Sequence, residues 1–136
     1  MVDLVITAAS VLPGAGATIK HVTSGATIVA GKSVVRDPAT GKWVLADSNH
    51  ATAALRITGG MALNGASDGQ PLAVQTGGPI TLGAVLTAGT AFYQSDTAGG
   101  VCPVSDVGSG ERSVLLGMAT SASSLLLDIA DSGVAL

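Results

Sequence analysis

Short runs of Val, Ile, Leu and Thr alternate along this chain with clusters of Gly, Asp, Asn, Ser and Pro. The first group of residues favours strands and the second favours turns. Apolar residues do not recur at the spacing of an amphipathic helix together with capping residues. The pattern predicts an all-β fold, a compact barrel or sandwich of many short strands, in one domain of 136 residues.

The turn clusters bound the predicted strands and define two hairpins. Pro38 and Gly41 supply the backbone angles for the first turn, and Ser95–Gly100 forms the second. Pro103 cannot donate to a strand ladder, so its strand is expected at an edge or a bulge. The predicted strands are Leu4–Ala8, Thr18–Thr23, Ala26–Val29, Lys32–Arg36, Lys42–Ala46, Leu55–Ile57, Met61–Leu63, Leu72–Gln75, Val85–Leu86, Thr90–Gln94, Val101–Val104, Ser113–Met118 and Ser124–Ile129.

The two hairpins resemble each other, which indicates a degenerate internal duplication. Ala30-Gly31 aligns with Ala88-Gly89, and Gly60-Met61-Ala62 aligns with Gly117-Met118-Ala119. A fixed spacing, here about 55 to 58 residues, marks repeated structural units. We therefore predict two β-units, residues 26–78 and 84–133, with Gly60 and Gly117 at equivalent places.

The composition favours a protein that buries surface against a partner. Charged residues are 11% of the chain, against about 25% in an average domain, and mean hydropathy is +0.56. The apolar runs are too short for a membrane span, and no Lys or Arg precedes Lys20, which argues against a secretory signal. Few charges and apolar patches are typical of interfaces.

Residues 1–16 are predicted to form an N-terminal arm that reaches a neighbour, ahead of a β-domain at 17–136. The sequence Leu12-Pro13-Gly14-Ala15-Gly16 indicates a flexible break between the two. The apolar residues of the arm and the only Trp are the candidate partner-binding residues. They are Val2, Leu4, Ile6, Leu12 and Trp43.

The charge balance gives no indication of a nucleic-acid partner. The net charge is −3, and the six basic residues are scattered along the sequence rather than clustered. The single cysteine, Cys102, excludes an internal disulfide, and its apolar neighbours predict a buried position in a strand.

One motif resembles a phosphate-binding loop. Ala26–Ser33 fits the loose pattern of a small residue, four residues of any kind, then Gly-Lys-Ser. However, Ile28 and Val29 favour a strand, and no helix pattern follows Ser33. The aligned site at Ala88-Gly89 has no Lys. We interpret the motif as a turn between strands.

No other pattern predicts catalysis, a metal or a cofactor. His21 and His50 lie far apart, and Glu111 is the only Glu, so neither a zinc site nor a glycosidase pair can be assigned. No Gly-x-Ser-x-Gly elbow occurs between a strand and a helix. Asp residues in predicted turns leave calcium open but without an EF-hand loop. They are Asp37, Asp47, Asp68, Asp96 and Asp106.

Residues Gly60–Gly78, with the sequence Gly-Met-Ala-Leu-Asn-Gly-Ala-Ser-Asp-Gly-Gln-Pro-Leu-Ala-Val-Gln-Thr-Gly-Gly, resemble the central signature of small phage capsid cement proteins. Ala30–Asp47 and Leu115–Ala122 also resemble segments of that family, and the resemblance extends from about Ala17 onward. It implies a β-rich homotrimer made in the host cytoplasm and seated on the outer surface of the virion, with the major capsid protein as partner.

Two other functions stay open at this point. The first is a head-fibre or tail-associated β-domain adhesin that binds a host surface, although three aromatic residues are few for sugar stacking. The second is an enzyme such as an ATPase, and the loose Gly-Lys-Ser motif is the only sequence feature that supports it.

Overall fold

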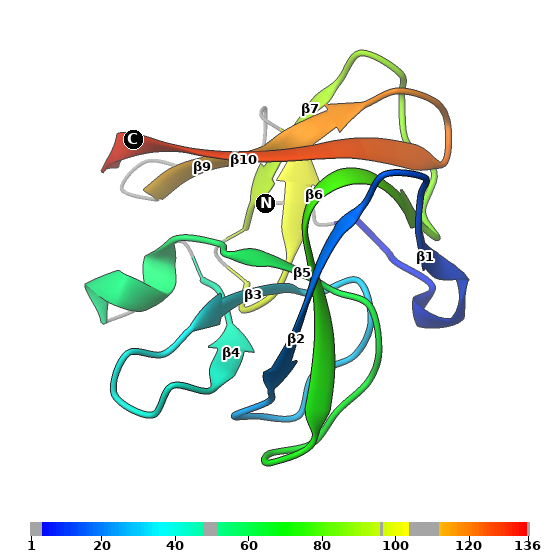
Figure 1. Ribbon diagram of the computed structural model, residues 1–136. Helices are drawn as coiled ribbons and strands as arrows, with labels where there is room; N and C mark the ends of the chain where they lie inside the picture. The colour runs from blue at the N-terminus through cyan, green and yellow to red at the C-terminus, as the bar shows by residue number, and fades with distance from the viewer. Residues whose placement is uncertain (1–3, 48–51, 96, 104–111, 136) are drawn as a thin grey trace.

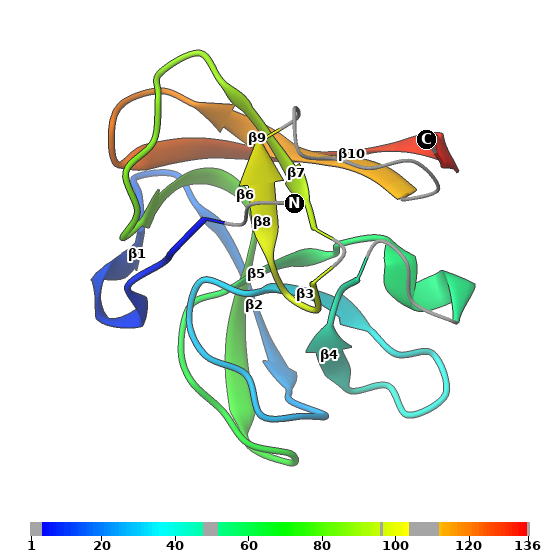
Figure 2. The same ribbon diagram turned by 180° about the vertical axis from the view of Figure 1, so that it is seen from behind.

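A computed structural model describes residues 4–47, 52–95, 97–103 and 112–135. These residues form one curled antiparallel sheet in the shape of a half-barrel, which confirms the all-β prediction (Figures 1 and 2). The strands are β1 (Val11–Pro13), β2 (Thr18–Thr23), β3 (Ser33–Arg36), β4 (Trp43–Leu45), β5 (Gly60–Ala62), β6 (Pro71–Leu82), β7 (Ala91–Gln94), β8 (Val101–Pro103), β9 (Arg112–Ala119) and β10 (Ser124–Ala135). The helical elements among them are two 3-10 turns, η1 (Ala8–Ser10) and η2 (Ala53–Arg56).

The order of the strands is symmetric about the middle of the sheet. The sheet runs β4-β3-β5-β6-β10-β9-β7-β8, so the second half repeats the first in reverse about the β6–β10 pair. The register repeats too: Val34 pairs with Gly60 and Leu45, as Phe92 pairs with Gly117 and Pro103. Gly60 and Gly117 therefore occupy equivalent places, as predicted from the sequence. Pro103 lies on the edge strand β8, which was also predicted.

The shared glycine has a physical reason, which is a close approach between strands. A Cβ atom on Gly60 would collide with Val74 and Gln75 of β6. A Cβ atom on Gly117 would collide with the backbone of Leu126 in β10. Only glycine lets each short strand lie this close to its long neighbour.

Strand β6 belongs to both units. Its first half pairs with β5 and β2, and its second half pairs with β10 and β1. Between the halves, Gly78 has a φ of +88°, which favours glycine, and a Cβ atom there would lie 2.9 Å from the Cα of Ala17. The buried amide of Gln75 donates to the carbonyls of Gly77, Gly78 and Pro79 at 2.8 to 3.1 Å. This side chain fixes the irregular stretch of the strand.

The interior is divided between the units. The larger apolar cluster lies on the side of the second unit and includes Phe92, Leu116 and Leu125, but it also takes Met61 from the first. A second cluster fills the first unit around Val34 and Trp43. Because Met61 lies in the cluster of the other unit, the two halves share one folded body.

Some predicted elements differ from the structure. Leu55–Ile57 was predicted as a strand but overlaps η2, where Leu55 is buried against Val35 and Ala46. Short apolar runs do not distinguish a strand from a buried helical turn. Leu4–Ala8, Ala26–Val29 and Val85–Leu86 also lie outside the strands, apart from one isolated bridge at Ile28. In contrast, β6 is much longer than the predicted Leu72–Gln75 because it continues through two glycines.

The described part of the segment predicted as an arm, residues 4–16, lies against its own chain. The Leu4 N–H donates to the Val101 carbonyl at 2.7 Å, and the Thr7 N–H donates to the Gly83 carbonyl at 3.0 Å. Strand β1 then pairs with β6. No helix among the described residues is long and apolar enough to span a membrane.

We expect Gly60→Ala and Gly117→Ala each to lower the free energy of unfolding by about 1–3 kcal/mol, since the new methyl group overpacks against a neighbouring strand. Gly65→Ala is the matched control, because its Cβ atom would meet only the Ile28 carbonyl oxygen, at 3.7 Å. Urea denaturation measures all three variants. A Gly117→Ala protein as stable as the Gly65→Ala protein would contradict the packing described for β9 and β10.

Candidate interaction surface

The structure separates the five residues predicted from the sequence to bind a partner. Val2 lies outside the described residues. Leu4 and Ile6 are half-buried and pack against the larger apolar cluster. Leu12 is 60% exposed, and Trp43 is 7% exposed. The four described residues therefore do not form one surface, and only Leu12 among them presents a largely exposed side chain.

Trp43, which the sequence suggested as a partner-binding residue, is part of the core of the first unit and is 7% exposed. It packs in one cluster with Val34 and Leu72. Gly59 makes room for the indole, because a Cβ atom there would lie 2.9 Å from Cζ3 of Trp43. A Trp side chain has a large apolar area, and in this chain with few aromatic residues that area is buried in the core.

An exposed apolar row crosses the outer face of the second unit. Leu126 of β10 pairs with Met118 of β9 on one side and with Pro79 of β6 on the other, and Met118 pairs with Ala91 of β7. Leu126 is 47% exposed and Met118 is 48% exposed. We call Pro79, Leu126, Met118 and Ala91 the outer row. Aligned apolar side chains on neighbouring strands make a continuous surface that water solvates poorly.

The first unit buries the positions that correspond to this row. Met61 aligns with Met118 and pairs with Gln75, and both Met61 and Gln75 are fully buried. Met61 contributes to the cluster that contains Leu116 and Val101 of the second unit. The second unit therefore covers the row of the first, whereas no part of the described chain covers the outer row to the same degree.

Sequence reasoning missed Met118 and Leu126 as surface residues. Leu125-Leu126-Leu127 reads as a fully buried strand, yet Leu125 and Leu127 are at most 2% exposed while Leu126 between them faces outward. Strand alternation could have identified one outward residue in this run, but it does not say which one.

The Gly-Lys-Ser motif does not form a phosphate loop. Gly31 donates its N–H to the Ala62 carbonyl at 2.8 Å, and Ser33 donates its N–H to the Gly99 carbonyl at 3.0 Å. Ser33 is fully buried at the start of β3, and its hydroxyl donates to the Gly100 carbonyl. These N–H groups are engaged, and Ala30-Gly31 forms a turn that leads into β3, as predicted; on the other side of the turn, an isolated bridge at Ile28 stands in place of the predicted strand.

Other candidate groups have structural roles. Cys102 is fully buried in β8, as predicted. Asp37 accepts the Ala39 N–H in the first hairpin turn, and Asp68 pairs with Lys42 at 3.2 Å. The described residues include no cluster of three His, Cys, Asp or Glu side chains. His50, Asp96, Asp106 and Glu111 lie outside the described residues.

Two hollows are present among the described residues. A cleft of about 70 Å³ lies between Leu4, Ile6 and Val101 and has space for only a few water molecules. An open groove of about 420 Å³ lies between β2 and the β3–β4 hairpin, and its lining includes Lys20, Arg36 and Trp43. The groove is the larger of the two.

No protein-family model matches the sequence, and no curated protein matches it.

The outer row predicts different effects of substitution at neighbouring positions. Leu125→Ala should lower the free energy of unfolding by about 2–5 kcal/mol, because it opens a cavity in the core. Leu126→Ala should change it by less than about 1 kcal/mol, because this side chain is already half in water. Thermal or urea denaturation separates the two outcomes, and equal losses would contradict the outward orientation of Leu126.

We expect no saturable ATP binding. The backbone N–H groups of Gly31 and Ser33 already donate to carbonyls within the protein, so they cannot donate to phosphate oxygens. Isothermal titration with Mg-ATP measures this directly. A saturable signal that is lost in the Lys32→Ala variant would refute the assignment of the motif to a turn.

Proposed function

We propose that this protein is a capsid decoration (cement) protein of a tailed bacteriophage. It binds the outer surface of the expanded head and stabilises the head by bridging subunits of the major capsid protein. The observation that carries the proposal is the outer row, an exposed apolar strip on a rigid sheet. The resemblance of Gly60–Gly78 to the small cement proteins points to the same role.

Physical requirements of such a role agree with the features of the chain. A filled head is under outward pressure, so a protein that reinforces it needs a stiff body with many cross-strand contacts. Here ten strands share one sheet, and Met61 of the first unit packs in the core of the second. The proposed action is binding without catalysis or cofactor, as a homotrimer on the virion, after synthesis in the host cytoplasm.

The adhesin alternative receives less support. Binding of a host glycan commonly uses exposed aromatic rings, on which sugars stack. Trp43 is 7% exposed and Phe92 is 3% exposed, and both belong to apolar clusters. Tyr93 alone among the three aromatic residues is half-buried rather than buried.

Co-sedimentation with expanded phage heads that lack this protein tests the proposal. We expect saturable binding at a fixed number of copies per head, together with greater resistance of the heads to heat. Leu126→Asp should weaken binding at least about tenfold, since the interface would bury an unpaired charge.

Val85→Asp is the matched control, because Val85 is 90% exposed and lies outside the outer row. It should bind as the unchanged protein does. Failure of the folded, unchanged protein to bind the heads would overturn the proposed function. If both substitutions weakened binding equally, the proposal that the outer row is the binding interface would be wrong.

A further inference from the structure

The groove between β2 and the β3–β4 hairpin is a seam where the half-barrel stays open. One edge of β2 pairs with β6, and β6 is its only strand partner among the described residues. Just beyond β2, Ser24 bridges to Trp43, and the Gly25 N–H donates to the Trp43 carbonyl at 2.7 Å. The free edge of β2 therefore faces the hairpin, and the groove lies where the two diverge.

The backbone of this edge is accessible. Five of the six residues of β2 are exposed, and Val22 is half-buried against the core of the first unit. A strand edge presents N–H and C=O groups that remain unpaired until another strand joins it. The groove is bounded on its other side by Gly41 and Arg36, and its floor includes Trp43. These features fit one extended peptide segment.

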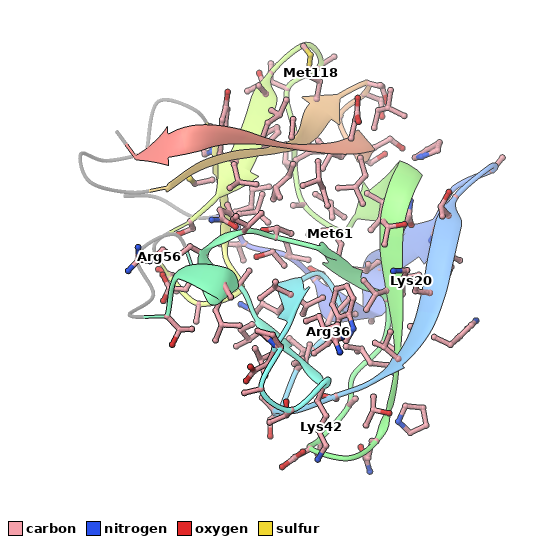
Figure 3. The ribbon with its side chains drawn as sticks, turned by 60° about the vertical axis from the view of Figure 1, so that its left-hand side comes forward. Lys20, Arg36, Lys42, Arg56, Met61 and Met118 are labelled. Atoms are coloured by element: carbon pink, nitrogen blue, oxygen red, sulfur yellow. The ribbon has the colours of Figure 1, made fainter. Side chains whose placement is uncertain are left out.

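The charges along the groove determine which segment fits. Lys20 and Arg36 line it from opposite sides, and neither forms an ion pair with a described residue. Lys42, on the same hairpin, pairs with Asp68. Figure 3 shows Lys20, Arg36 and Lys42 together on the side of Met61 that faces away from Met118. Half of the six basic residues are thus gathered in this region.

Basic side chains are also concentrated in the first part of the sequence, which contains the groove. Residues 1–78 contain five basic and four acidic side chains, for a net charge of +1. Residues 79–136 contain one basic and five acidic side chains, for a net charge of −4. Lys20 and Arg36 therefore give the groove two cations on an acidic protein, and the carboxylates of a ligand would find complementary charge there.

We propose that this groove binds an extended acidic peptide segment of a partner protein, which adds to the free edge of β2 as a further strand. Main-chain hydrogen bonds to β2 supply the alignment, and Lys20 and Arg36 select glutamate or aspartate side chains. The site is separate from the outer row, so it does not depend on attachment to a capsid.

Two other occupants fit less well. A second β2 strand is opposed by charge, since antiparallel pairing of two copies brings Lys20 of each towards the other. A nucleic acid prefers a longer basic track and exposed rings for stacking, whereas Trp43 is 7% exposed. An acidic peptide requires only the two free cations and a strand edge.

The single Trp provides the measurement, because Trp43 lines the groove. The probe is a peptide of six residues, the length of β2, that alternates Glu and Val. We expect a saturable change in Trp43 fluorescence that weakens as salt is raised. The double variant Lys20→Gln, Arg36→Gln should weaken binding at least about fivefold. Lys32→Gln, which removes one positive charge outside the groove, should leave binding unchanged.

Strand addition is tested with peptides methylated on alternate backbone nitrogens, in the two possible frames. One frame should lose binding and the other should retain it, because a strand bonds to its neighbour through alternate residues. Equal binding in both frames would overturn strand addition.

Three further outcomes would overturn the choice of partner. They are no saturable binding of the acidic peptide by the folded protein, equal binding of a peptide that carries Lys in place of Glu, and tighter binding of oligo(dT) than of the acidic peptide. None of these experiments uses phage heads, so their failure is distinguishable from failure of the capsid proposal.

Discussion

Strand β6 is the constraint on which the rest of the structure depends, because both units complete their hydrogen bonding on it. Its first half carries β5 and β2, and its second half carries β10 and β1. A straight strand would hold these neighbours in one flat sheet. The positive φ of Gly78 and the Gln75 amide nitrogen, which lies 2.8 to 3.1 Å from three backbone carbonyl oxygens, fix an irregular stretch between the halves instead. This stretch lies where β6 passes from the first unit to the second.

Duplication then explains why the two faces of the molecule differ. The two units have the same register, so each contains an equivalent row of positions. The second unit covers the row of the first, whereas no described part of the chain covers the outer row to the same degree. Met61 and Gln75 are covered by the second unit, and Met118 and Leu126 are left outside. The two rows also differ in residue type: the covered row contains the polar Gln75, bonded to backbone carbonyls, where the outer row has Leu126. An apolar side chain at the exposed place is the reverse of what solubility alone favours.

The sequence predicted what depends on local chemistry. Strand β2 has the predicted bounds, both hairpins form around the predicted turns, and Gly60 and Gly117 are equivalent. The errors lie where tertiary contacts decide. Leu55 enters the core from a 3-10 turn, and Trp43 is accepted into the core because Gly59 has no side chain. Periodicity gives two faces to each strand, but only the assembled sheet shows which face a neighbour covers. The outer row and the basic groove were therefore not foreseen.

The two surfaces place different chemistry at separate parts of one stiff body. Met118 lies on one side of Met61 and the cations Lys20, Arg36 and Lys42 on the other (Figure 3). Apolar contact at the outer row is insensitive to salt, whereas pairing at the groove weakens as salt screens the charges. A protein that joins neighbours on a proposed capsid lattice benefits from this difference, since one contact supplies strength and the other supplies orientation. Because β6 reaches both units, the distance between the two contacts is fixed by the sheet itself.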